Sequence, residues 1–479
     1  MTRTKWLVVL WLAAAAASCA VRPPAVRSVP EDEGSAWIYL EPLPAGAERL
    51  EADLSAAAAV REDGTTWPLT LVLRRLATGT PPRERLLAWG PLPAGRYAGV
   101  ALTFSGATLE GGEGPGVLQV QAEPVRVLFP FEAARRRAAV IALSLRFPES
   151  VGSGYRFAPA FAATGPRTLA IGLTGLASCR GAGVVMMFDR TSGSIVSVVP
   201  VGADPEGIAV DSGRFRGYVA VAGADRVEAI GLPEQVALDR VQLSGGDRPS
   251  ELVLTPDGRR LLVVNSGSNT VSVLDARTLV EAKRISVGNG PSALVLDRTG
   301  RRAFVLNTLS DSVSFIDVRL PDEVPSAGAL SYQPTVTIGV DAGPVRGALD
   351  RSGERLFVGH GPSPYLTVLD TKTLAVSRRV YVGTGAMAMT VDPRTDRLYL
   401  ARRGAGGVEV FDPGSLLPVD FIRADGDVGD LVVDAEANTL FLALPEVNEV
   451  RAVTLIGKRS VVALDAGETP YRLALAGAR

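Results

Sequence analysis

Histidine and cysteine are nearly absent from this chain of 479 residues, which contains one histidine and two cysteines. Their scarcity excludes sites that need several such residues: an HExxH zinc site, a haem held by two histidines, a CxxCH haem attachment and a histidine-rich copper centre. The chain also lacks a GxSxG nucleophile elbow and a Walker phosphate-binding loop. We therefore expect neither redox nor phosphate chemistry, and no haem, copper or zinc.

An excess of charge of either sign is also missing. The 50 Lys and Arg residues nearly balance the 51 Asp and Glu residues, which leaves a net charge of -1. Nucleic-acid binding needs a clustered positive surface that displaces counterions, so we expect no nucleic-acid partner. A length of 479 residues favours two domains, and 51 glycines with 33 prolines among Val-, Leu- and Thr-rich segments predict an all-β protein with many tight turns.

The first residues read as a processing signal. Arg3 and Lys5 precede an apolar run, residues 6 to 17, that is too short to span a bilayer. The small residues before Cys19 resemble a bacterial lipobox, which implies that residues 1–18 are a lipoprotein signal peptide and that Cys19 is lipidated. An ordinary signal peptide is the alternative. Ala20 after the cysteine, again by resemblance, implies an outer-membrane lipoprotein that faces the periplasm or the cell surface.

Residues 19–35 then form a tether rich in proline and acidic residues. If Cys19 is acylated, Cys179 has no partner for an intramolecular disulfide. Cys179 is then either a buried structural thiol, which is the more common case, or a reactive one.

A first folded domain is predicted over residues 36–163. Alternating apolar residues at 36–43, 69–76, 97–106 and 138–147 indicate strands, and strands at this spacing usually make a sandwich of two sheets. LPAGRYAGVAL (92–102) and LSLRFPESVGSGYRFAPAF (143–161) resemble a β-sandwich family of unknown function found in secreted bacterial lipoproteins. The resemblance implies no catalytic residues, so we interpret the domain as a spacer, with carbohydrate binding as an alternative.

The rest of the chain is repetitive. Strand starts such as PSELVL and PSALVL recur from positions 205, 249, 291, 344, 386, 428 and 470, at intervals of 44, 42, 53, 42, 42 and 42 residues. The longest interval contains an apparent surface insertion at 320–334. Four strands per period of about 42 residues are typical of a propeller blade, which needs neighbours on both faces.

LLVVN (261–265) and AFVLN (303–307) resemble the motif of the YVTN β-propeller repeat, a family that often has seven blades. The resemblance covers residues 166–479. The last repeat stops after one strand, whereas three strands precede the first repeat, at 167–175, 184–190 and 194–202. We therefore predict a seven-bladed β-propeller closed by the C-terminal strand, because closure removes exposed sheet edges.

Candidate site residues lie in loops on one face of this ring. Most loops that enter an innermost strand carry an acidic or amide side chain: Asp204, Asp247, Asn289, Asp341, Asp427 and Glu468. Carboxylate and amide oxygens suit Ca²⁺, so these residues could line a cation site at the channel mouth, but Asp and Asn are also ordinary turn residues. We expect further contacts on the same face from Arg248, His360, Arg402, Arg403 and Tyr471.

These observations leave three hypotheses. The first is an envelope-anchored lipoprotein that acts as a binding or scaffolding module through the propeller loop face, with an envelope protein or polysaccharide as partner and no chemistry of its own. The second is a Ca²⁺-dependent lactonase or hydrolase at the channel mouth, since propeller lactonases polarise a carbonyl with such a cation. The third is a carbohydrate-binding surface protein.

Overall fold

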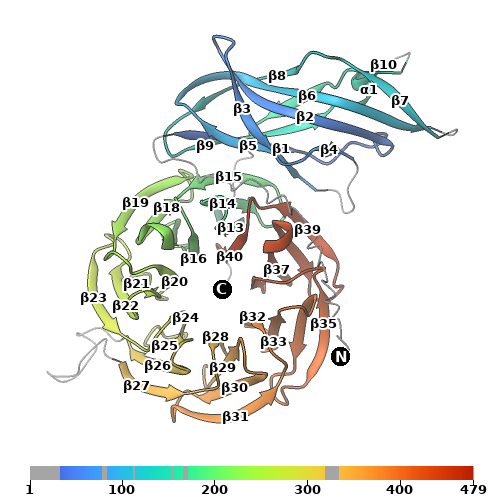
Figure 1. Ribbon diagram of the computed structural model, residues 1–479. Helices are drawn as coiled ribbons and strands as arrows, with labels where there is room; N and C mark the ends of the chain where they lie inside the picture. The colour runs from blue at the N-terminus through green and yellow to red at the C-terminus, as the bar shows by residue number, and fades with distance from the viewer. Residues whose placement is uncertain are drawn as a thin grey trace, which may run out of the picture.

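The computed structural model describes residues 33–77, 83–111, 114–152, 155–165, 171–318 and 334–477. Figure 1 shows a closed ring of small sheets, with a separate N-terminal sheet lying against the rim of the ring. Within the described residues, none of the helices has the length and apolar character needed to cross a membrane. The predicted signal peptide, Cys19 and nearly all of the insertion at 320–334 lie outside these residues.

The N-terminal part is one curled sheet of twelve strands, where the sequence predicted two sheets. Its path runs β10-β11-β7-β6-β2-β3-β5-β1-β9-β12, and β4 and β8 pair with β2 and β6. The sheet stays continuous because β3 pairs with both β2 and β5 and so joins its two halves. The curl encloses a core that includes Ile38, Leu50, Tyr97, Ile141 and Phe157, all at 0% exposure.

The elements of this part are, in chain order, β1 Gly34–Leu40, β2 Leu50–Arg61, β3 Thr66–Leu71, β4 Arg75–Leu76, β5 Arg85–Leu92, β6 Gly95–Gly111, β7 Gly114–Val120, β8 Val125–Ala133, β9 Ala138–Leu145, α1 Phe147–Ser150, β10 Val151–Gly152, β11 Arg156–Phe157 and β12 Phe161–Thr164. The four predicted strands correspond to β1, β3 with β4, β6 and β9.

The ring is a seven-bladed β-propeller in which every blade is an antiparallel sheet of four strands. The second and third strands of a blade are almost entirely buried, as in β21 and β22, because neighbouring blades cover both of their faces. The fourth strand forms the outer rim and is largely exposed in blades such as that of β31, whereas the fourth strand of blade 1, β15, is buried where it contacts β9 of the N-terminal sheet. This gradient explains why the second strands read as unbroken apolar runs such as LLVV.

Blades are numbered from the one that contains both ends of the ring. Their strands, from the innermost outward, are blade 1, β40 Pro470–Leu475, β13 Thr174–Cys179, β14 Val184–Asp189 and β15 Ile195–Pro200; blade 2, β16 Pro205–Asp211, β17 Arg216–Val221, β18 Arg226–Gly231 and β19 Val236–Gln242; blade 3, β20 Pro249–Leu254, β21 Arg260–Asn265, β22 Thr270–Asp275 and β23 Glu281–Ser286; blade 4, β24 Pro291–Leu296, β25 Arg302–Asn307, β26 Ser312–Asp317 and β27 Pro334–Gly339.

The remaining strands are blade 5, β28 Pro344–Leu349, β29 Arg355–His360, β30 Tyr365–Asp370 and β31 Ala375–Tyr381; blade 6, β32 Ala386–Val391, β33 Leu398–Arg402, β34 Gly407–Phe411 and β35 Pro418–Arg423; and blade 7, β36 Asp430–Asp434, β37 Thr439–Leu444, β38 Glu449–Thr454 and β39 Ser460–Asp465. Single 3-10 turns form at η1 Ile171–Leu173, η2 Ala222–Ala224 and η4 Pro445–Val447.

The C-terminal strand closes the ring as predicted, since β40 pairs with β13 in blade 1. The strand predicted at 167–175 was misplaced: β13 spans Thr174–Cys179, and a 3-10 turn occupies Ile171–Leu173. Both stretches are apolar, so the register with β40 and β14 decides which one forms the strand.

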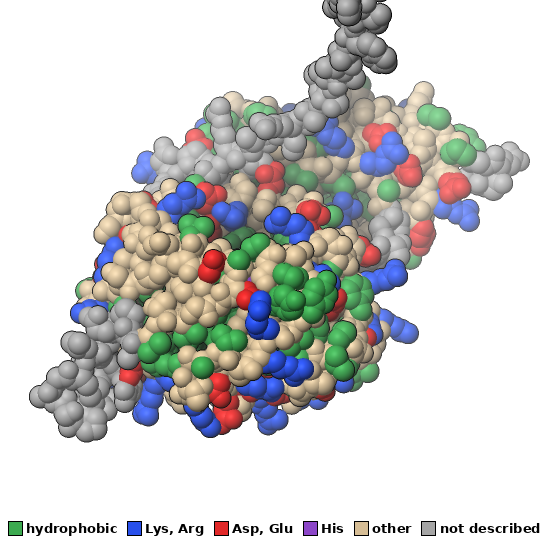
Figure 2. Space-filling view, turned by 60° about the horizontal axis from the view of Figure 1, so that its bottom comes forward, with side chains coloured by type: hydrophobic (Ala, Val, Ile, Leu, Met, Phe, Trp, Pro, Cys, Tyr) green, Lys and Arg blue, Asp and Glu red, His purple; other side chains and the backbone are tan. Residues whose placement is uncertain are grey.

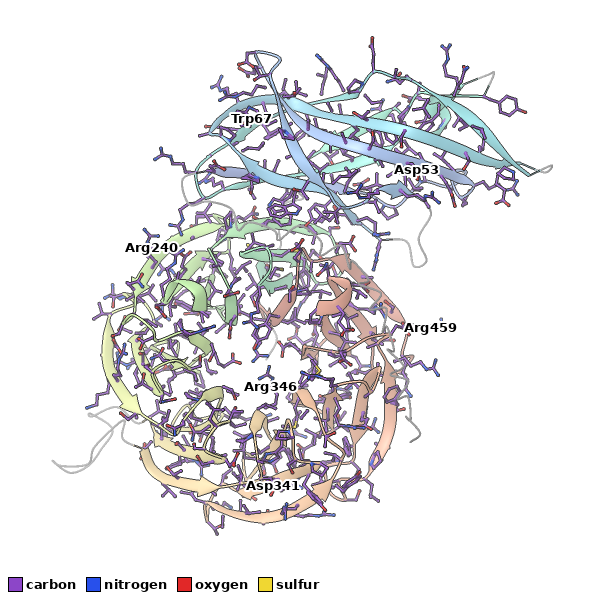
Figure 3. All side chains as sticks on the ribbon, in the orientation of Figure 1. Asp53, Trp67, Arg240, Asp341, Arg346 and Arg459 are labelled. Atoms are coloured by element: carbon purple, nitrogen blue, oxygen red, sulfur yellow. The ribbon has the colours of Figure 1, made fainter. Side chains whose placement is uncertain are left out.

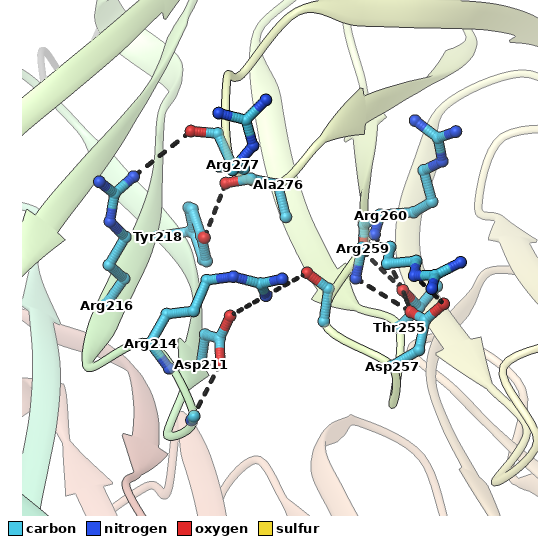
Figure 4. A network of polar contacts seen from close by, with 12 residues as sticks. Asp211, Arg214, Arg216, Tyr218, Thr255, Asp257, Arg259, Arg260, Ala276 and Arg277 are labelled. Atoms are coloured by element: carbon cyan, nitrogen blue, oxygen red, sulfur yellow. Dashed lines mark hydrogen bonds and ion pairs between the residues drawn. The ribbon is translucent and has the colours of Figure 1, made fainter.

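Arginines join neighbouring blades on the face opposite the entry loops. In blade 2, Arg214 Nη1 donates to Asp211 Oδ2 at 2.8 Å and to the Gly258 carbonyl of blade 3 at 2.6 Å (Figure 4). Arg302 repeats the arrangement, because its Nη1 donates to the carbonyl of Thr371 in the next blade at 3.0 Å. These side chains have both an ion-pair partner and a backbone acceptor, which gives them a structural role.

Hairpins between the third and fourth strands share an Asp turn. Asp275 Oδ1 accepts hydrogen bonds from the backbone N–H groups of Arg277 and Thr278 at 3.0 and 2.9 Å. Asp370 and Asp412 form the same turn. In the turn, the carboxylate accepts hydrogen bonds from backbone N–H groups that have no backbone acceptor there.

The N-terminal sheet and the propeller share one hydrophobic core. Trp37 and Trp89 stack with ring centroids 4.8 Å apart and are 0% and 3% exposed. They pack between blades 1 and 7 against Phe188 and Phe441, among others. We call this contact region the domain seam.

Ion pairs surround the domain seam and extend it to three blades. Arg83 pairs with Glu449 and Asp465 of blade 7. Arg136 Nη2 lies 2.9 Å from Glu228 Oε2 of blade 2, whose side chain is fully buried. Each of these charges has an oppositely charged partner, so burial is compensated.

Candidate functional site at the centre of the ring

Two of the predicted acidic loop residues turn away from the centre of the ring. Asp247 Oδ1 accepts a hydrogen bond from Arg284 Nη1 of β23 at 2.9 Å, and Asp341 Oδ2 accepts from Arg379 Nη2 of β31 at 2.7 Å. Figure 3 accordingly places Asp341 toward the outer part of the ring. Both carboxylates fasten an entry loop to the fourth strand of its own blade.

The other four predicted residues do not gather either. Asp427 Oδ1 accepts from the Gly404 backbone N–H at 2.6 Å, Asn289 is exposed, and Asp204 adopts left-handed backbone with φ 51°. Burial raises the pKa of Glu468. In the described ranges, no three His, Cys, Asp or Glu side chains come close enough together to hold a metal ion. The six residues therefore act as separate loop residues in this structure.

The predicted loop-face contacts divide into exposed and internal residues. Arg248 and Arg403 are exposed on the loops. Arg402 ends β33, and its Nη2 lies 2.7 Å from Glu409 Oε1. His360 is not on the loop face: it ends β29, is 1% exposed, and its Nε2 lies 2.9 Å from Thr367 Oγ1.

The position at the end of each second strand explains the burial of His360. Asn265 occupies it in blade 3, where Nδ2 donates to Ser272 Oγ at 2.8 Å and holds the hairpin between the second and third strands. His360 replaces this asparagine in blade 5, and burial lowers its pKa. Cys179 occupies the position in blade 1, where it is fully buried, donates to the Ala466 carbonyl and has its pKa raised by burial.

Sequence reasoning missed a set of charged residues on the innermost strands. The third residue of the seven repeat starts is small in three blades (Gly207, Ala293 and Ala388) and charged in four (Glu251, Arg346, Asp430 and Arg472). Alignment of the seven strand starts with one another would have revealed them. Because the innermost strands surround the axis of the propeller, these four side chains form its polar centre, which we call the central cluster.

Arg472 links three blades within the central cluster. Its Nε donates to Glu251 Oε2 of blade 3 at 3.0 Å, and its Nη1 lies 3.7 Å from Asp430 Oδ1 of blade 7. Blade 2 lies between blades 1 and 3, and there the third residue is Gly207. A Cβ at Gly207 would stand 2.6 Å from the Glu251 Cα, so glycine permits the close approach of β16 to β20.

Tyr471 lies between two guanidinium groups next to the central cluster. The Cζ atoms of Arg180 and Arg472 are 4.5 and 4.7 Å from the centroid of its ring. Arg180 Nη2 also lies 2.8 Å from Glu206 Oε1. Cation–π contacts with these two groups orient the phenol ring.

Burial sets the protonation behaviour of these groups. It raises the pKa of Asp430 and of Glu206, although nearby arginines oppose the shift. For Arg472, burial acts to lower the pKa, but Glu251 and Asp430 outweigh it and the net shift is upward. For Arg346, burial and the positive charge of Arg472 lower the pKa.

Arg346 is the exception within the central cluster because it forms no ion pair with any residue that the structure describes. Its Nη1 donates to the Val345 carbonyl at 2.8 Å, whereas its buried Nε has no hydrogen-bond partner among the described residues. Figure 3 places Arg346 inside the ring of innermost strands. The charged side chains of the central cluster can recognise ionic groups. Their contacts with the described residues include no nucleophile paired with a base.

Comparisons with known proteins show a likeness in fold alone. The chain matches no protein-family model and no curated protein. Hydrazine synthase of Kuenenia stuttgartiensis is similar in structure, with 18% identity, a TM-score of 0.51, and coverage of 59% of this chain and 92% of that one. A functionally unknown protein from Desulfotomaculum acetoxidans is 13% identical, with a TM-score of 0.55 and coverage of 64% and 99%.

A third similar structure is the dihydro-heme d1 dehydrogenase NirN in complex with DHE, with 14% identity, a TM-score of 0.50, and coverage of 65% of this chain and 77% of that one. At such identities these likenesses concern the propeller fold, because one fold serves many unrelated functions.

Proposed function

We propose that this protein is an envelope-anchored lipoprotein of the YVTN type whose propeller binds an envelope protein or polysaccharide and performs no chemistry of its own. The N-terminal sheet would act as the spacer between the lipid on Cys19 and the propeller. The observation that carries the proposal is the central cluster, in which charged side chains from four blades meet at the loop end of the innermost strands. Ionic recognition, rather than acid–base catalysis, fits these groups.

The surface supports a partner of mixed character. Figure 2 shows Lys and Arg side chains interspersed with Asp and Glu side chains over the side of the ring in view, in keeping with the net charge of -1. A surface without one prevailing sign favours specific contacts over general attraction to a polyanion.

Site-specific crosslinking in intact envelopes tests the binding function. A photoreactive amino acid replaces Arg403 or Arg248, which are exposed on the loop face, and the matched control replaces Arg459 on a hairpin between a third and a fourth strand, at the opposite face. We expect one discrete adduct from the first two positions and none from the third. Adducts from all three positions alike, or from none, would contradict the proposal.

Fractionation tests the anchor separately. Cys19→Ala should move the protein from the membrane fraction to the soluble fraction, because the acyl chains supply the membrane affinity. Retention of the variant in the membrane fraction would reject lipidation at Cys19.

A further inference from the structure

Other arginine side chains of the propeller bind both a carboxylate and a backbone carbonyl through their guanidinium groups. Arg355, in the same blade as Arg346, donates from Nε to Asp350 Oδ2 at 2.9 Å and from Nη1 to the Pro413 carbonyl at 2.6 Å. Arg346 has no carboxylate partner in the part of the chain that the structure describes. The Arg346 side chain is half-buried, and Asp430 and Glu251 attract it without forming an ion pair among the described residues, so its buried Nε is a donor that lacks an acceptor there.

Arg472 adds a second and independent observation. It is 5% exposed, and its Nη2 lies 2.9 Å from Glu251 Oε2, whereas its buried Nη1 has no acceptor within hydrogen-bond distance among the described residues and lies 3.7 Å from Asp430 Oδ1. Arg346 Nε and Arg472 Nη1 are therefore two buried donor nitrogens in one neighbourhood without a hydrogen-bond acceptor among the described residues. Buried donors normally have an acceptor from protein, water or a bound ion.

We propose that the central cluster is an oxyanion site, in which Arg346 and Arg472 hold a carboxylate or phosphate group of a ligand. Planar guanidinium groups match the oxygen geometry of both groups and bind them with charge-assisted hydrogen bonds. Tyr471, whose ring contacts the guanidinium groups of Arg180 and Arg472, lies beside this position and helps to orient Arg472.

The charges of the cluster balance one another and limit how many anions it can hold. Arg180, Arg346 and Arg472 face Glu206, Glu251 and Asp430, and the latter two carboxylates are ion-paired with Arg472. Arg346 supplies the second positive charge that balances these two carboxylates. The cluster therefore has no net positive charge, so its donor nitrogens can hold one oxyanion and the resulting negative charge would repel a second.

Calorimetric titration of the full chain in non-ionic detergent tests the site with two probes, inorganic phosphate and acetate, at constant ionic strength set by sodium chloride. We expect saturable binding of at least one probe, and the arm that binds identifies the chemistry as phosphate or carboxylate. Arg346→Gln should weaken that binding at least about tenfold, because one charge-assisted contact is removed. The control Arg459→Gln, at an exposed arginine, should bind like the wild type.

Binding of neither probe, or equal binding by the wild type and Arg346→Gln, would overturn the inference. If Arg346→Gln fails to fold, Arg346→Lys decides, since it keeps the charge and removes the planar fork; affinity equal to that of the wild type would then overturn it. The inference rests on the proposed binding function for the source of the oxyanion. Anion binding without loop-face adducts would reject the envelope partner, and adducts without anion binding would reject the oxyanion site.

Discussion

Arg355 and Arg346 lie on neighbouring strands of blade 5 and differ in how they are engaged. Arg355 opens β29, pairs with the buried Asp350 and reaches the backbone of the next blade, as Arg302 does in blade 4. Arg346 lies in β28 beside the axis and has one backbone acceptor. The same residue type thus stabilises the ring at one place and faces its centre unpaired at the other.

This difference separates structural charge from functional charge. The propeller and the domain seam compensate buried charges, as with Glu228 between Arg136 and Arg226. Where a charge stays uncompensated, the fold gains nothing from it, and a ligand that binds there supplies the missing partner. Substitutions at the two kinds of position should therefore differ in sign as well as in size.

The largest loss of stability is expected at the domain seam, where the N-terminal sheet and the propeller share a hydrophobic core. Trp37→Ala removes a fully buried indole from the core shared by both parts and should lower the free energy of unfolding by about 3–5 kcal/mol. Urea denaturation followed by circular dichroism measures the change. Trp67→Ala is the control, since Trp67 is 39% exposed and should cost less than about 1 kcal/mol; equal losses would show that the seam does not stabilise the protein.

The next largest loss of stability is expected in the ion-paired part of the central cluster. Glu251→Gln leaves the buried Arg472 without its closest carboxylate and should cost about 3 kcal/mol. The control Asp53→Asn breaks a pair with Arg75 whose side chains are 46% and 60% exposed, and it should cost under about 1 kcal/mol. A loss at Glu251 no larger than at Asp53 would mean that the Arg472 pair is not structural.

A smaller loss of stability is expected when the paired arginine of blade 5 is replaced. Arg355→Gln removes its hydrogen bonds to Asp350 and to the next blade and should cost about 1–2 kcal/mol, because the site is partly exposed. Thermal melts measure it. An unchanged melting temperature would remove the contrast with Arg346.

The smallest expected effect concerns the Asp turns and depends on pH. In Asp275, Asp370 and Asp412, the backbone N–H of the residue three positions on lowers the pKa. A folded-state pKa below the unfolded value means that these groups stabilise the protein above about pH 4 and lose that contribution as pH falls through the lowered pKa. Changing all three to Asn keeps the turn acceptors and should make the urea midpoint less sensitive between pH 6 and pH 3; equal sensitivity would contradict this account.

The sequence allowed the architecture of the ring to be predicted because each blade repeats one local pattern. Apolar second strands, turn residues and a 42-residue interval recur along the chain. Closure by β40 follows because the last repeat has one strand and the other three strands of its blade precede the first repeat. The curled N-terminal sheet was less accessible. Its continuity depends on β3 pairing with both β2 and β5, and the alanine-rich stretch at 55–59 within β2 carries little strand signal.

The sequence did not show how the predicted site residues are engaged in the structure. Asp247 and Asp341 read as free acids because their partners, Arg284 and Arg379, lie 37 and 38 positions away on the fourth strands. His360 aligns with Asn265 and Asn307 in the repeats, but it read as a loop residue because the sequence does not show that this position is buried. The central cluster was visible only by comparison of the repeats.

The most direct test of the central claim is the melting temperature of Arg346→Gln beside that of Arg355→Gln, both in buffer free of carboxylate and phosphate. If Arg346 is held for a ligand, its removal breaks no ion pair among the described residues and removes a buried donor nitrogen that lacks an acceptor, so the variant should melt at or above the wild-type temperature while Arg355→Gln melts below it. If Arg346→Gln melts as far below the wild type as Arg355→Gln does, Arg346 stabilises the fold and the account of the central cluster as a ligand site is contradicted.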